Sequence, residues 1–282
     1  MPFGDDGSAF RPPLGRAIGD GRTPPRPLLH RMYVACHVLR LGTEARFTAL
    51  VLLHRYFAAV SSSGGSDAKR AERSDAGWAA AACLFLACKA EEEPRRLRDV
   101  INLAHMLLLA SPSDHETTEK DIITLKNPPD LNQAYWDNKK QIVETEQEVL
   151  RWLSFDASVS HPHRIVTLLS ERHPDCDRLI RMAFRRLNDA LFHAPALRHR
   201  ALEMAVAAMR LAAEELRREG DSAGFTVGDG AFLARYGVVE KAMADAERDL
   251  EEATMVLKRE AAKGEASSEM LLEGIQSHSQ KA

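Results

Sequence analysis

Apolar residues recur every three or four positions along most of this chain, and short runs that alternate apolar and polar residues are almost absent. This spacing is the period of an amphipathic α-helix, whereas alternation would indicate a strand. The sequence therefore predicts an all-α protein. The predicted helices cover residues 28–40, 43–60, 75–90, 96–109, 132–153, 161–172, 177–193, 197–218 and 238–262, with a short further turn at 230–236.

The predicted helices fall into two groups of about five, separated near His161-Pro162-His163. Two such groups indicate two five-helix domains in tandem, although no sequence repeat relates them. Gly and Pro punctuate the N-terminus, and the C-terminus is mostly polar, so both ends are expected to lack regular structure. Two polar insertions, 61–74 and 111–130, interrupt the first group. The predicted divisions are an N-terminal tail over 1–27, a first domain over 28–156, a second domain over 157–262 and a C-terminal tail over 263–282.

Composition narrows the classes of function that remain. The 282 residues carry 38 Lys and Arg against 41 Asp and Glu, a near balance that argues against nucleic-acid binding through overall charge. No apolar run reaches the ~18 residues of a membrane span, and the N-terminus lacks a signal-peptide pattern. The four cysteines form no CxxC pair and are interpreted as small buried residues of a reducing compartment. We expect an intracellular protein.

Catalytic and metal-binding motifs are missing from the sequence. It contains no Gly-rich phosphate loop followed by Lys-Ser/Thr, no GxSxG and no HExxH. His161 and His163 have no nearby Cys, His or Asp in the sequence that would complete a metal site, and we interpret them as shaping the entrance to a helix. The sequence thus predicts no catalytic residue, no metal and no cofactor.

Two charged residues interrupt apolar helix faces. In the predicted helix 132–153, steps of three and four along the apolar stripe place both Lys139 and Glu146 on or next to the buried face. The predicted helix 75–90 is almost wholly apolar and ends with the cation Lys89. Lys89 can simply complement the helix dipole there. Alternatively, Lys89 and Glu146 form a polar patch that binds backbone groups of a partner, since a buried carboxylate must find donors.

Arginines crowd the start of the next predicted helix, at Arg95, Arg96 and Arg98. Cations at a helix N-terminus oppose the helix dipole, so their presence needs a reason. One interpretation is an exposed face paired with the acidic run 91–93. The other is contact with an acidic or phosphorylated partner, since guanidinium forks suit carboxylate and phosphate.

Three motifs stand out in the sequence: Cys-Lys-Ala-Glu-Glu at 88–92, Pro-Arg-Arg-Leu-Arg-Asp-Val-Ile-Asn at 94–102 and His-Pro-His at 161–163. Through these motifs, residues 82–108 and 131–169 resemble a cyclin box, and among cyclins they resemble the transcription and splicing group, especially cyclin L. The resemblance implies two tandem cyclin folds, the second more divergent because it matches weakly after about residue 195. The first helix lacks the MRAILVDW-type motif that carries substrate docking in cell-cycle cyclins, so the resemblance does not imply such a groove.

The family implies a regulatory subunit rather than an enzyme. Such a subunit would bind and activate a cyclin-dependent Ser/Thr kinase that acts in transcription or pre-mRNA processing, in the nucleus and without direct nucleic-acid contact. In cyclins a Lys and a Glu hydrogen-bond the kinase segment near its αC helix, and the matching positions are Lys89 and Glu146. Glu91 and Glu92 complete the expected kinase-binding set.

Other functions remain open on the sequence alone. One is a cyclin Q- or K-like partner of a different kinase. Another is a DNA-bound adaptor of the transcription factor IIB kind, against which stand the near-neutral charge and the absent zinc ribbon. A third is a helical scaffold that binds no kinase. For regulation, Thr23-Pro24 and Ser111-Pro112 are candidate sites of proline-directed phosphorylation.

Overall fold

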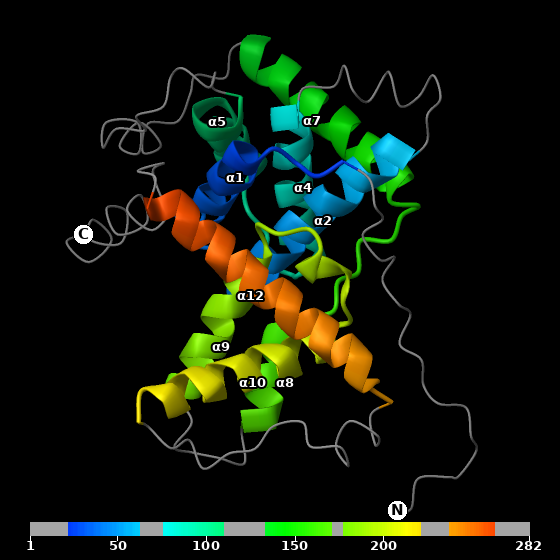
Figure 1. Ribbon diagram of the computed structural model, residues 1–282. Helices are drawn as coiled ribbons and strands as arrows, with labels where there is room; N and C mark the ends of the chain where they lie inside the picture. Colours follow the sequence, from blue (N-terminus) through cyan, green and yellow to red (C-terminus); the bar gives the residue numbers. More distant parts are fainter. Residues whose placement is uncertain (1–21, 63–75, 110–132, 171–176, 221–236, 263–282) are drawn as a thin grey trace, which may run out of the picture.

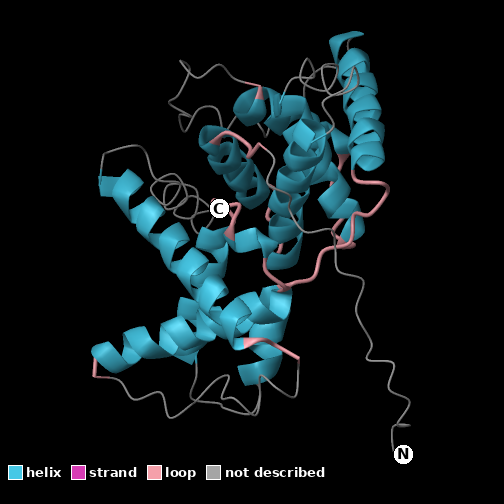
Figure 2. Ribbon diagram, turned by 45° about the vertical axis from the view of Figure 1, so that its right-hand side comes forward, coloured by secondary structure: helices cyan, strands magenta, loops and turns pink. Residues whose placement is uncertain are grey.

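The computed structural model describes residues 22–62, 76–109, 133–170, 177–220 and 237–262. Within these ranges the chain forms helices joined by turns and no strand (Figure 2). The prediction of an all-α fold is confirmed. The expected turn at 230–236, most of both insertions and most of the two tails lie outside the described residues.

The first group of helices surrounds α4 (Ala76–Ala90), which lies at its centre (Figure 1). Because α4 is rich in Ala and almost wholly buried, its neighbours can approach closely. At Gly77 the approach is tightest, since an added Cβ would lie 2.4 Å from the carbonyl oxygen of Leu108. The helices in contact with α4 are α1 (Arg26–Val38), α2 (Thr43–Ser62), α5 (Leu97–Leu103), the π-helical turn η1 (Ala104–Leu108) and α7 (Gln133–Trp152).

The second group is built on α10 (Ala201–Arg218), which packs against three other helices. Its buried face consists mainly of Ala, Val, Met and Leu at helical spacing, as expected for a core helix. Its neighbours are α8 (Pro162–Ser170), α9 (Asp177–Ala190) and α12 (Glu240–Ala262), and the short 3₁₀ turn η2 (Ala196–Arg198) precedes it.

Two predicted helices are interrupted in the structure. The helix expected over 96–109 widens after Leu103 into η1, where the amide of Leu109 donates to Ala104 five residues back. The helix expected over 197–218 breaks because Arg200 has extended backbone angles and its amide donates to the Glu203 carboxylate at 2.9 Å. This bond satisfies an amide at the start of α10, so the helix begins anew at Ala201.

The two groups share one continuous hydrophobic core. Phe192, after α9, stacks on His30 of α1 with ring centroids 4.5 Å apart. His54 of α2 shares a 2.9 Å hydrogen bond with the carbonyl of Leu191. The C-terminal end of α12 lies beside α1 (Figure 1), and an ion pair between Glu260 of α12 and Arg26 of α1 joins the two helices. These contacts stabilise the two groups against each other. Among the described residues, no helix is long and apolar enough to cross a membrane.

Candidate functional site

Lys89 and Glu146 form an ion pair between the end of α4 and the middle of α7. The Glu146 side chain is 11% exposed, whereas that of Lys89 is 44% exposed. The Lys89 ammonium also lies 4.5 Å from the centroid of the Phe85 ring, one turn earlier on α4. The structure thus brings together the two charges that interrupted the apolar patterns, with Lys89 facing solvent and Glu146 held beneath it.

An apolar strip flanks this pair along α7. At about 100° per residue, Trp136 and Val143 lie within ~80° of Glu146, on the side away from the buried Ile142. Trp136 is 50% exposed and lies under the Lys139 ammonium, which is 5.0 Å from the ring centroid. The sequence analysis did not identify this strip. Helical spacing from Glu146 was the signal that could have revealed it.

Phe155 is a second exposed aromatic residue of this part of the chain. It follows the C-terminal end of α7, is 71% exposed and has a left-handed backbone with φ of 60°. A bulky residue rarely adopts this conformation, and a large exposed ring gains nothing from the core. Strained backbone positions cluster at active sites, ligand clamps and switch regions. The sequence analysis did not single out Phe155.

Glu91, expected to contact a kinase, lies at the junction between the two helical groups. Its carboxylate accepts a 2.6 Å hydrogen bond from the Thr48 hydroxyl of α2 and one of 3.1 Å from Nε2 of His161. Ligand atoms of Glu44, Glu91 and His161 lie within 4.8 Å of one another, a grouping that the sequence analysis missed. Glu44 is paired with Arg164 at 3.2 Å. Protein partners therefore satisfy both carboxylates, and Glu91 joins the two groups.

Glu92 is the residue of the acidic run that stays exposed. It ends α4 in a left-handed conformation, with φ of 55°. The amide of Glu92 donates to Lys89 and that of Glu93 to Cys88, at 3.3 and 2.9 Å, which is the Schellman arrangement of a helix C-terminus. This reversal of the chain begins directly after Lys89. Because of it, the side chains of Glu91 and Glu93 contact different neighbours.

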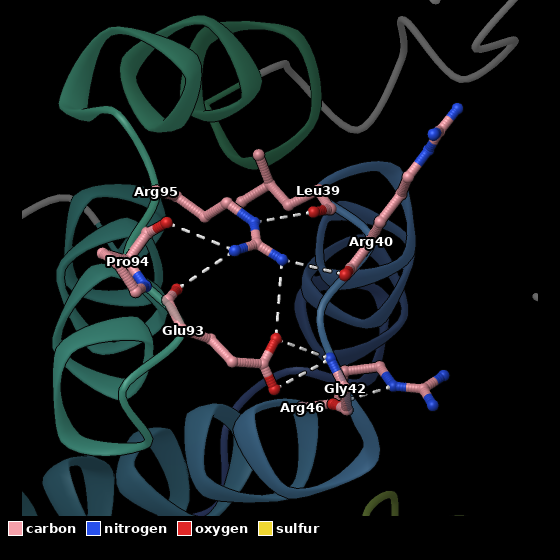
Figure 3. Close-up of polar contacts among 7 residues, drawn as sticks. All are labelled: Leu39, Arg40, Gly42, Arg46, Glu93, Pro94 and Arg95. Atoms are coloured by element: carbon pink, nitrogen blue, oxygen red, sulfur yellow. Dashed lines mark hydrogen bonds and ion pairs between the residues drawn. The ribbon is translucent and has the colours of Figure 1, made fainter.

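Glu93 and Arg95 hold the turn between α1 and α2 (Figure 3). The Glu93 carboxylate accepts the amide of Gly42 at 2.9 Å, at the positive N-terminal end of α2. The Arg95 guanidinium donates to the carbonyls of Leu39 and Arg40, both at 2.9 Å, at the negative C-terminal end of α1. One segment thus neutralises the ends of two helices, and we call Glu93 and Arg95 the turn clamp.

The three arginines predicted to contact an acidic partner have different surroundings. Arg95 is committed to the turn clamp and its side chain is 26% exposed. Arg96 is exposed immediately before α5, and Arg98 is half-buried within α5. Arg96 therefore remains the most accessible of the three for a partner.

Buried titratable groups are poorly suited to acid–base chemistry at neutral pH. Burial lowers the pKa of His54 and of His163 to about 4 each. Burial also raises the pKa of the Cys88 thiol to about 11, so it stays protonated. These groups are neutral packing elements near pH 7.

Part of this chain is similar to known proteins. Residues 25–158 match the family described as Cyclin, N-terminal domain. Cyclin-L1 of Homo sapiens is 33% identical over 183 residues, which cover 64% of this chain and 31% of that cyclin. Cyclin-L1 of Xenopus laevis is 32% identical over 185 residues, covering 64% of this chain and 33% of the relative, and Cyclin-L2 of Mus musculus is 33% identical over 182, covering 64% and 31%. The matched part thus spans about a third of the relatives' length.

A solved structure supports the same fold. A chain from the crystal structure of the yeast RNA Pol II CTD kinase CTDK-1 complex superposes with a TM-score of 0.57 at 19% identity. The match covers 80% of this chain and 64% of that chain. Residues 25–158 therefore match a cyclin N-terminal domain, the chain has an all-α cyclin fold, and its sequence resembles that of the L cyclins.

Proposed function

We propose that this chain is the regulatory subunit of a cyclin-dependent Ser/Thr kinase that acts in transcription or pre-mRNA processing in the nucleus. The observation that carries the proposal is the Lys89–Glu146 pair, which α4 and α7 present beside an exposed apolar strip. The sequence resemblance to the L cyclins supports the choice of process.

The pair can bind the backbone of a partner helix. In the free protein the two charges satisfy each other. On docking, the Lys89 ammonium can donate to a backbone carbonyl, while the Glu146 carboxylate accepts a backbone amide. Because the Glu146 side chain is only 11% exposed, it loses little conformational freedom on binding. The strip formed by Trp136 and Val143 supplies apolar area beside these polar contacts.

Activation follows from differential affinity. A kinase is active when its β3 lysine pairs with the αC glutamate, and the position of αC controls that pair. A rigid face that binds only the active position of αC shifts the kinase toward it by the difference in affinity for the two states. The chain then needs no catalytic group of its own.

The test is affinity purification of the tagged chain from its own cells, followed by a kinase assay on a polymerase C-terminal repeat peptide. Lys89→Ala with Glu146→Ala should remove both the kinase and the activity. The matched control is Lys140→Ala with Glu144→Ala, because this exposed ion pair lies on α7 about opposite the buried stripe. Equal recovery of kinase with both double variants would refute the proposed contact, and a common melting temperature would exclude misfolding.

A further inference from the structure

The whole sequence contains two Ser/Thr-Pro dipeptides, and Thr23-Pro24 lies within the described residues. Thr23 is exposed and lies three residues before α1. Pro24 and Pro25 follow it and restrict the segment to extended backbone, as Pro25 shows with φ of −57° and ψ of 134°. Proline-directed kinases act on Ser or Thr followed by Pro in an extended chain, so Thr23 has the required local form.

Access to this dipeptide requires a small opening. Pro24 is buried, and the amide of Arg22 donates to the Ser61 hydroxyl at the end of α2, at 2.8 Å. A short segment that precedes the first helix is the kind of element that opens locally at low cost. A kinase can therefore engage Pro24 once residues 22–25 have lifted from α2.

The charges around Thr23 favour a phosphate after it is added. α1 has no acidic residue in its first turn, and no side chain caps its N-terminus. The Arg26 guanidinium, at the start of α1, makes the ion pair with Glu260 that returns α12 to the first group. A phosphate dianion is a stronger partner for Arg than a carboxylate, and a helix N-terminus adds to its stability.

We propose that Thr23 is a phosphorylation site for a proline-directed Ser/Thr kinase, and that the phosphate takes Arg26 from Glu260 and releases the end of α12 from α1. The Thr23 hydroxyl oxygen attacks the γ-phosphorus of ATP. A new O–P bond forms, the bond from that phosphorus to the bridging oxygen breaks, ADP leaves, and the hydroxyl proton passes to the kinase's general base. The proposal does not depend on Lys89 or Glu146.

The modification is tested on the full chain with a purified proline-directed kinase, Mg²⁺ and ATP, and phosphate is located by mass spectrometry. Thr23→Ala should remove the phosphate, and Thr23→Ser should restore it. Pro24→Ala, which keeps the hydroxyl, should slow its addition at least tenfold. Ser111→Ala should leave it unchanged. If a free peptide spanning 18–30 is phosphorylated but the full chain is not, the site is overturned.

The structural consequence has a separate measurement. Amide hydrogen exchange in the last two turns of α12 should become several-fold faster on phosphorylation, while exchange in α4 stays the same. Glu260→Gln should show the faster exchange without phosphate, and phosphorylation should then add little. Unchanged exchange in phosphorylated wild-type protein would overturn the transfer of Arg26.

Discussion

Replacing Arg95 by Ala tests whether this arginine belongs to the protein's own structure or to a partner site. The guanidinium makes two 2.9 Å hydrogen bonds, to the carbonyls of Leu39 and Arg40, and longer ones to Glu93 and Pro94. Hydrogen bonds from a charged group contribute about 1.5–3 kcal/mol each when buried. Because Arg95 is 26% exposed and water can replace part of them, the expected loss for both is about 2–3 kcal/mol.

The assay is urea unfolding followed by circular dichroism, with Arg96→Ala as the matched control. Arg96 carries the same charge one position later, is exposed, and should change the unfolding free energy by less than ~0.5 kcal/mol. Arg95→Lys keeps the charge but cannot span two carbonyls, so it should recover about half of the loss. If Arg95→Ala and Arg96→Ala cost the same, the turn clamp contributes no stability, and Arg95 returns to the set of partner contacts.

Three further outcomes follow from the same region and from the buried histidines. Gly42→Ala should cost about 1–2 kcal/mol, because its Cβ would lie 2.4 Å from the Glu93 carboxylate and force it off the Gly42 amide. Glu92→Gly should raise the unfolding free energy by about 0.5–1 kcal/mol, because glycine accepts a φ of 55° without strain; a loss would contradict this conformation. His54 and His163, with pKa values near 4 when folded and about 6.5 when unfolded, contribute stability that is fully present above pH 6.5. That stability should fall by ~1.4 kcal/mol per pH unit for each histidine between pH 6.5 and 4 in urea titrations, and a flat profile would show that they are not buried.

Helical periodicity alone identified Lys89 and Glu146 as charged residues that interrupt apolar helix faces. Each stands at a spacing of three or four from apolar neighbours, so its position on a helix face could be calculated without a structure. The sequence analysis placed the two residues in one polar patch, and the cyclin resemblance implied that both contact a kinase. The structure pairs them with each other across α4 and α7. Two of the nine predicted helices are interrupted in the structure. The sequence did not reveal these interruptions, because neither a widened turn nor a new helix N-terminus alters the apolar pattern.

The roles of the acidic run could not be predicted, because a row of three glutamates looks uniform in sequence. Glu91 and Glu93 accept hydrogen bonds from Thr48 of α2 and from Gly42 directly before it, both more than 40 residues away in the chain. Which carboxylate faces which neighbour depends on the left-handed conformation of Glu92. Local propensity does not favour that conformation for glutamate, so the Schellman bonds at the end of α4 and the contacts of Glu91 and Glu93 together select it.

The same contacts explain why the proposed kinase-binding face would be rigid. Lys89 lies in the last turn of α4, directly before a reversal whose other residues are fixed to α1, α2 and the start of α8. Movement of this reversal would displace Lys89 from Glu146. A face held in this way offers one geometry to αC and shifts the kinase only toward the state that fits. Arg95→Ala should therefore weaken kinase activation because it loosens the turn clamp, whereas Arg95→Lys should restore part of the activation in proportion to the stability that it recovers.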